Sequence, residues 1–119
     1  MMTKEDFSID ALVEKMKRPE IGGIVTFLGT VRGDAGITTL NVEIYKEMAV
    51  DELEKLKREA HEKFEIEAVE IVHREGELNV GENIVAILVG AKHRKEAFRA
   101  CEYLIDELKK RVPIWKKED

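Results

Sequence analysis

Basic side chains are concentrated in two segments of this 119-residue sequence, residues 92–95 and residues 108–117. Lysine, arginine and histidine bind phosphate and carboxylate groups, and a lysine that is partly desolvated or close to other cations has a lowered pKa. Such a lysine can act as a proton donor, a nucleophile or an anchor for an anion. The two segments therefore indicate amine chemistry on an anionic substrate.

The first segment, Lys-His-Arg-Lys, falls at the predicted start of the last helix, where positive charge is unfavourable. Free backbone amides and the macrodipole already make a helix N-terminus positive, so adjacent cations are repelled unless an anion is bound. We therefore expect a phosphate site at His93 and Arg94. Arg32 ends a predicted strand beside a glycine-rich loop and could add a bidentate contact to the same phosphate. The alternative is that the helix begins later and these side chains are only solvated.

The second segment contains two kinds of cation. Residues 109–111, Lys-Lys-Arg, lie at the predicted end of the helix, where the dipole by itself favours positive charge. Lys116 and Lys117 have no such explanation, because they follow Pro113 and flank Trp115. We expect the tryptophan to dock against the protein and one of these two lysines to be held over a pocket.

The two segments are too far apart on one helix to share a small substrate. Arg94 and Lys109 are fifteen residues apart, which at 1.5 Å per residue separates them by roughly 22 Å. Either the C-terminal segment folds far back, or a second copy of the chain supplies half of the site. We adopt the dimer as the hypothesis, because a two-fold axis produces such sharing naturally.

Other reactive side chains are weaker candidates. Cys101 lies within an apolar helical stripe, and a buried cysteine is usually inert. His61 is on a charged helix and His73 in a strand, and neither shares a ligand spacing with His93, so we predict no metal site. The sequence also lacks a glycine motif of the nucleotide-binding type.

Hydrophobic periodicity predicts three main helices that position these residues, over residues 9–18, 49–64 and 94–112. It predicts short, mostly antiparallel strands over residues 24–31, 40–45, 69–73 and 83–91. The first strand is expected to be buried on both sides for much of its length and to form a hairpin with the second, with a mobile tip. Residues 75–82 are expected to be a turn-rich connection. Together these elements predict one α+β domain over residues 1–119.

Composition excludes several classes of protein. Acidic residues outnumber basic ones by 25 to 20, so we do not expect nucleic acid as the main partner. The chain has one cysteine, which excludes a disulfide framework. No secretory segment and no long apolar run are present, which indicates a soluble protein without a membrane span. The expected location is the cytoplasm.

Five fragments occur in the order and with the spacing typical of one family. They are VTFLGTVR at 25–32, EIY at 43–45 with Met48, HREGEL at 73–78, AKHR at 91–94 with Ala97 and Phe98, and LKKRVPIWK at 108–116. Together they resemble the large, catalytic subunit of molybdopterin synthase, from about Ile21 to Lys117.

The resemblance implies an α+β hammerhead-type fold and a homodimer within a heterotetramer. A small ubiquitin-like sulfur carrier would bind at each end, with its C-terminal Gly-Gly thiocarboxylate in a pocket of the large subunit. Sulfur would be transferred twice to cyclic pyranopterin monophosphate to make the dithiolene of molybdopterin, which later holds molybdenum or tungsten. The large subunit itself would need no cofactor.

The resemblance also implies roles for individual residues. Lys109 and Lys116 match the catalytic pair, which would neutralise the carrier tail and the developing charge or shuttle protons. Arg32, His93 and Arg94 match the anion-binding residues. Phe27 matches a residue in the wall of the pocket. The two halves of the site are expected to come from different large subunits.

Two features depart from the family pattern. The chain stops at Asp119 where many members continue with basic residues, so one anion contact is expected to be missing or replaced. Ile105 stands where some members carry methionine, a swap that should be mild.

The alternative functions are a non-catalytic dimeric module that binds a phosphorylated metabolite or an acidic peptide tail, and a plain scaffold for the carrier.

Overall fold

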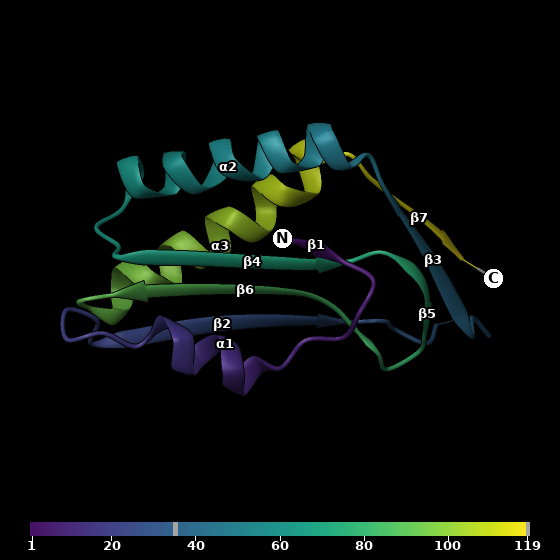
Figure 1. The fold of residues 1–119 in the computed structure, drawn as a ribbon, viewed down its shortest axis with the longest axis horizontal. Helices are drawn as coiled ribbons and strands as arrows, with labels where there is room; N and C mark the ends of the chain where they lie inside the picture. Colours follow the sequence, from purple (N-terminus) through teal and green to yellow (C-terminus); the bar gives the residue numbers. More distant parts are fainter. Residues whose placement is uncertain (35, 119) are drawn as a thin grey trace.

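The computed structural model describes residues 1–34 and 36–118, which form two β-sheets and three helices (Figure 1). The helices are α1 (Ile9–Met16), α2 (Lys46–Lys63) and α3 (Arg94–Arg111). The strands are β1 (Met2–Thr3), β2 (Gly23–Thr30), β3 (Thr39–Ile44), β4 (Ala68–Arg74), β5 (Gly76–Asn79), β6 (Asn83–Ala91) and β7 (Ile114–Glu118). The larger sheet has the order β1-β4-β6-β2 and the smaller one β5-β3-β7.

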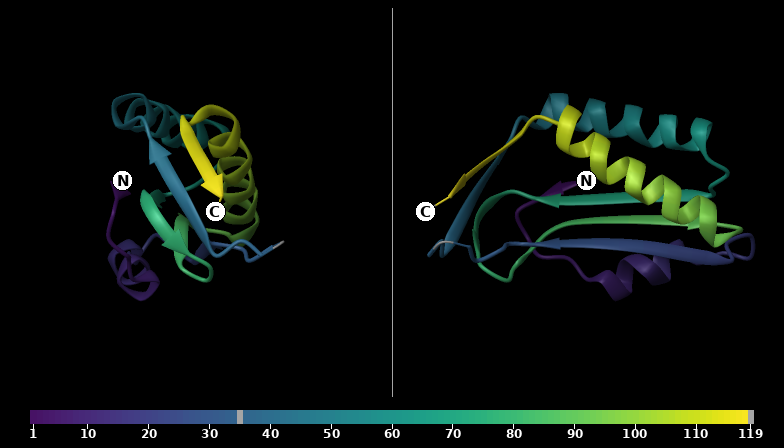
Figure 2. Two further views of the ribbon diagram at one scale, coloured as in Figure 1. Left: turned by 90° about the vertical axis from the view of Figure 1, so that its right-hand side faces the viewer. Right: turned by 180° about the vertical axis from the view of Figure 1, so that it is seen from behind.

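The predicted α+β class, with three main helices and mostly antiparallel strands, is confirmed. Strand β1 runs parallel to β4, whereas the pairs formed by β2, β3, β5, β6 and β7 are antiparallel. The smaller sheet lies at one end of the larger one, next to the C-terminus (Figures 1 and 2). Within the described residues, no helix combines the length and the apolar composition needed to span a membrane.

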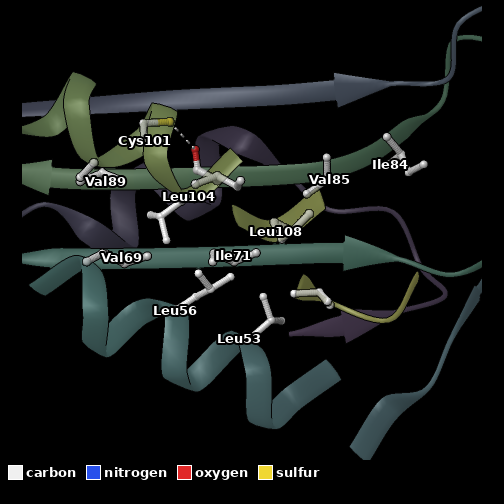
Figure 3. Close-up of a cluster of buried hydrophobic side chains, with 14 of the residues drawn as sticks. Leu53, Leu56, Val69, Ile71, Ile84, Val85, Val89, Cys101, Leu104 and Leu108 are labelled. Carbon is white, nitrogen blue, oxygen red and sulfur yellow. Dashed lines mark hydrogen bonds between the residues drawn. The ribbon is translucent and has the colours of Figure 1, made fainter. Parts of the chain in front are cut away.

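The larger sheet separates two apolar clusters. Helices α2 and α3 cover one face, where Leu56 and Leu104 pack with Ile71 of β4 (Figure 3). Helix α1 covers the opposite face, where Met16 packs with Leu88 of β6. From Val85 to Val89, successive residues of β6 enter opposite clusters because side chains alternate along a strand. This two-sided burial explains why β6 is apolar along nearly its whole length.

The prediction that the first two long strands form a hairpin is wrong. Strand β2 pairs with β6, with Phe27 opposite Ile87, whereas β3 pairs with β5 and β7 in the other sheet. The alternating pattern identified both strands, but it does not encode which strand is the partner. The tip of that predicted hairpin includes Ala35, which lies outside the described residues.

Strand β2 is also not buried on both sides. It is an edge of the larger sheet, and Thr26, Leu28 and Thr30 are exposed in alternation with partly buried residues. Its β-branched and aromatic composition was therefore a sign of strand propensity and not of burial on both faces.

Two short strands were not predicted. Strand β5 lies within the segment expected to be a turn-rich connection, and β7 is formed by the residues that follow Pro113. Both are held by β3, which lies between them and supplies backbone hydrogen bonds on each side. Such short strands are stabilised by a partner distant in the sequence, so local patterns indicate them only weakly.

Candidate functional site

A cavity of about 520 Å³ lies where α3 ends and the two sheets meet. Its lining includes four of the six residues that the sequence singled out, Phe27, Arg32, Lys109 and Lys116. Phe27 comes from β2, Arg32 from the loop that follows it, Lys109 from the last turn of α3 and Lys116 from β7. The fold thus collects an aromatic wall and three cations from four separate segments.

Helix α3 places Lys109 at the cavity because positions shortly before it on the helix are buried in the core. Leu104 and Leu108 are buried, so the residue after Leu108 emerges at the edge of the buried face. Ile105, the position where some family members carry methionine, lines the same cavity one turn earlier. The helix then ends at Arg111, and Pro113 follows at a point where a further helical hydrogen bond would be lost.

Strand β7 places Lys116 through its register with β3. Lys116 lies opposite Val42, which is buried, and Trp115 lies opposite Glu43, which is exposed. Because side chains alternate along a strand, Lys116 lines the cavity while Trp115 is on the other face. Trp115 packs edge-on against Tyr45, with ring centroids 4.6 Å apart, but 52% of its surface remains exposed. Backbone pairing, more than burial of the tryptophan, therefore fixes the position of Lys116.

The two cavity lysines are electrostatically coupled. Partial burial, and then the charge of Lys109, lowers the pKa of the Lys116 amine. The other helix-end cations are engaged elsewhere: Arg111 contacts Glu52 and Glu59 of α2 at 3.3 and 2.6 Å, which joins the two helices. Of the three cations at 109–111, Lys109 is therefore the one that the fold directs to the cavity.

Arg32 lies at the mouth of this cavity. Its side chain is 86% exposed and its Nε atom is 2.6 Å from the Asp34 carboxylate. An exposed ion pair of this kind is weak, so an incoming anion can compete for the guanidinium at little cost.

His93 and Arg94 lie at the opposite end of α3 from Lys109. His93 is the N-cap residue but makes no capping hydrogen bond through its side chain, and both residues are exposed. Arg94 adjoins Gly23, the first residue of β2, whereas Arg32 follows the last residue of that eight-residue strand. A strand of that length spans about 26 Å. Within one chain the structure therefore does not bring Arg32 together with His93 and Arg94, and their common phosphate site stays a prediction.

Cys101 is packed as the sequence suggested. The residue is 3% exposed, and its Sγ atom is 4.0 Å from the Ile87 carbonyl oxygen (Figure 3). Burial raises the pKa of the Cys101 thiol to about 11. A thiol that is neutral and covered at neutral pH is a poor nucleophile.

His73 is a cavity residue that sequence reasoning missed. It lies in β4, is 1% exposed and lines the same cavity as the two lysines. Its Nδ1 atom is 2.8 Å from the backbone carbonyl oxygen of Arg74, and burial lowers its pKa to about 4. The available signal was a histidine followed by an arginine at the end of a mostly apolar strand. Within the described residues, no three His, Cys, Asp or Glu side chains are grouped to hold a metal ion.

The chain is similar to proteins of one kind throughout its length. Residues 2–111 match the family model described as MoaE protein. The molybdopterin synthase catalytic subunit of Pyrococcus abyssi is 47% identical over 117 residues, covering 96% of this chain and 79% of that protein. The corresponding subunit of Thermoplasma volcanium is 42% identical over 120 residues, covering 98% of this chain and 88% of that protein.

Solved structures of the same kind share the fold. The crystal structure of molybdopterin synthase from Staphylococcus aureus has a TM-score of 0.93 at 36% identity, covering 99% of this chain and 88% of that one. A complex of subunits 1 and 2 of the molybdopterin-converting factor from Helicobacter pylori contains a chain with a TM-score of 0.86 at 23% identity. That match covers 98% of this chain and 82% of the other.

Proposed function

This chain belongs to the MoaE family of molybdopterin synthase catalytic subunits, and we propose that it transfers sulfur from a thiocarboxylated carrier protein to cyclic pyranopterin monophosphate. As a member of that family it is an enzyme subunit of molybdenum cofactor biosynthesis. The product of the proposed reaction is the dithiolene of molybdopterin, made by two successive sulfur transfers.

The observation that carries the proposal is the cavity shared by Lys109 and Lys116. Its mixture of an aromatic wall and cations suits a reaction between two anions, a thiocarboxylate and a phosphorylated pterin. Bringing two anions together costs electrostatic energy, which fixed ammonium groups offset most strongly where water is partly excluded. We propose that Lys109 and Lys116 are the catalytic residues and that Arg32 and Phe27 contact substrate.

The lowered pKa of Lys116 supports a role in proton transfer. An ammonium group gives up its proton more readily when its pKa is nearer to neutrality. The amine lines the same cavity as Lys109, whose charge contributes to that lowering. When water attacks the carrier acyl carbon and its bond to sulfur breaks, a carboxylate remains on the carrier and the sulfur remains on the pterin. Lys116 would thus protonate that departing sulfur, while Lys109 remains a fixed positive charge.

The rest of the site is proposed to come from a second copy of the chain. Among the described residues, strand β2 pairs on one side only and is an edge of the larger sheet, with Leu28 40% exposed. Phe98 on the neighbouring helix α3 is 60% exposed. An unpaired edge flanked by exposed apolar side chains is a surface suited to pairing with another strand.

Two-fold pairing of β2 with its copy would complete the cavity. An axis through the middle of this eight-residue strand places Gly23 of one copy opposite Thr30 of the other. Arg94 adjoins Gly23, so Arg94 and His93 of the second copy would arrive near Arg32 and the cavity. This arrangement agrees with the distance that separates the two basic segments along α3.

The partner is proposed to be a small ubiquitin-like sulfur carrier whose Gly-Gly tail enters the cavity. The complex of two subunits of the Helicobacter pylori molybdopterin-converting factor, which shares this fold, supports a partner subunit. With one carrier bound to each copy of a central dimer, the assembly would be a heterotetramer.

The decisive experiment is reconstitution with the purified chain, a thiocarboxylated carrier and cyclic pyranopterin monophosphate. Dithiolene product, detected by mass spectrometry, is expected only when all three are present. If a carrier that is active with another synthase gives no product here, the proposed reaction is wrong. Binding of the pterin phosphate without turnover would instead favour the non-catalytic module, and binding of the carrier alone would favour the scaffold.

A further inference from the structure

His73 is a buried polar side chain at the cavity that the proposed roles of the lysines leave unused. It sits near the end of β4, directly opposite Val85 of β6, and 1% of its surface is exposed. Burying an imidazole is unfavourable unless its polar atoms have partners. One of its two ring nitrogens, Nδ1, has such a partner in the backbone carbonyl oxygen of Arg74. The other ring nitrogen, Nε2, is left for a second contact.

The hydrogen bond at Nδ1 determines the state of the ring. The Arg74 carbonyl oxygen can only accept, so Nδ1, at 2.8 Å, must carry the proton and donate it. Burial disfavours the imidazolium form, and the ring is therefore neutral at neutral pH. In that tautomer Nε2 carries a lone pair and can only accept a hydrogen bond.

The residue that holds the ring is itself firmly fixed. Arg74 is 7% exposed, and its guanidinium donates to a carboxylate oxygen of Glu82 and to the backbone carbonyl oxygens of Asn83 and Lys4. A ring that is bonded to so constrained a backbone has little freedom to turn. Its acceptor atom therefore has a defined position relative to the cavity.

We propose that His73 is a positioning residue, whose Nε2 lone pair accepts a hydrogen bond from the Lys116 ammonium, directly or through one water, and holds that amine over the cavity. The proposal rests on the proposed function in that Lys116 is taken as the catalytic amine. His73 of β4 and Lys116 of β7 line the same cavity, and the charge of Lys116 contributes to the lowered pKa of His73.

The surrounding charges favour a neutral acceptor at this point. Lys109 from α3, Lys116 from β7 and Arg32 from the loop after β2 bring positive charge to the cavity, and the charge of the Met1 ammonium, just before β1, also acts on His73. Glu118 and Asp34 are the acids that line it. A second cation at position 73 would repel Lys116, whereas a neutral lone pair attracts its N–H groups.

Two substitutions separate this role from a merely structural one. The His73→Asn side chain can place a donor where Nδ1 lies and so keep the bond to Arg74, but it has no atom at the position of Nε2. The His73→Gln side chain can place its amide oxygen near the Nε2 position. The measurements are kcat and KM for sulfur transfer, together with the titration of Lys116 followed by NMR of 13C-labelled lysine side chains.

We expect His73→Gln to keep kcat within a few-fold of the native value and His73→Asn to lower it about tenfold with KM little changed. The pKa of Lys116 should fall further in His73→Asn, because an acceptor that stabilises the ammonium is lost. Equal kcat values in the two variants, or a higher kcat in His73→Asn than in His73→Gln, would overturn the proposal. The titration needs no turnover, so it tests the contact even if the proposed sulfur transfer fails. If His73→Asn does not fold, the Lys116 titration in folded His73→Gln is the test. An altered pKa of Lys116 would count against the proposal, and an unaltered pKa would count for it.

Discussion

Lys116 lies opposite Val42 in the antiparallel pair of β7 and β3, and this register turns its side chain into the cavity that Lys109 reaches from the end of α3. A helix and a strand thereby deliver two amines to one place, although only a short segment with one proline separates them. A shift of one residue in the β7 register would send Lys117 to the cavity instead.

The position of the lysines leads to a first prediction about catalysis. Lys109→Ala and Lys116→Ala should each lower kcat for sulfur transfer by at least about a hundredfold, because each removes a charge or proton donor at the reacting groups. Binding of the carrier should largely survive. The matched control is Lys117→Ala, on the opposite face of β7, which should leave kcat nearly unchanged. Losses that follow carrier affinity in all three variants would contradict the assignment.

Sharing of the site between two copies predicts complementation. Lys109→Ala and His93→Ala should each be nearly inactive alone. After unfolding and refolding together at equal concentration, half of the dimers are mixed and one of their two sites is intact, so about a quarter of native activity should return. Mixing Lys109→Ala with Lys116→Ala should restore nothing, since both lysines belong to the same half. An absence of recovery in the first mixture, with mixed dimers demonstrated by mass spectrometry, argues that His93 acts within its own chain.

The edge of β2 provides a separate test of the dimer. Leu28→Lys places a charge on an exposed side chain of the free edge, and we expect it to shift the protein towards monomer by analytical ultracentrifugation. Turnover should fall in parallel. Val50→Lys is the control, because Val50 is similarly exposed, at 46%, but lies on α2. A dimer that is unaffected by Leu28→Lys would show that another surface is used.

The buried imidazole predicts a dependence of stability on pH. The pKa of His73 is about 4 in the folded protein, against an ordinary value of 6.5. Between these values the unfolded chain binds more protons than the folded one, so the free energy of unfolding falls as the pH is lowered through this window. The full effect is up to about 3 kcal/mol.

His73→Gln isolates this contribution, because protonation of carboxylates affects both proteins alike. Urea unfolding at pH 7 and pH 4 should show that the native protein loses more stability than the variant does. If the two proteins lose the same amount of free energy between these pH values, His73 is not held neutral by the fold.

The sequence by itself determined the elements whose stability is local. The apolar stripes of α2 and α3 and the continuous apolar run of β6 are visible in a short window, and their predicted bounds are close to those observed. The same local reasoning located the two basic segments and their separation along α3. The family motifs then indicated Lys109 and Lys116 as the expected catalytic pair.

Only the tertiary structure decided which segments meet. Strand pairing joins residues far apart in the chain, so no local pattern could show that β2 pairs with β6, that β7 forms along β3, or that Trp115 stays half exposed. The cavity position of His73 has the same origin. The residues next to His73 in the sequence predict a strand. The lysines that share its cavity come from β7 and α3, which approach His73 only when the two sheets pack together.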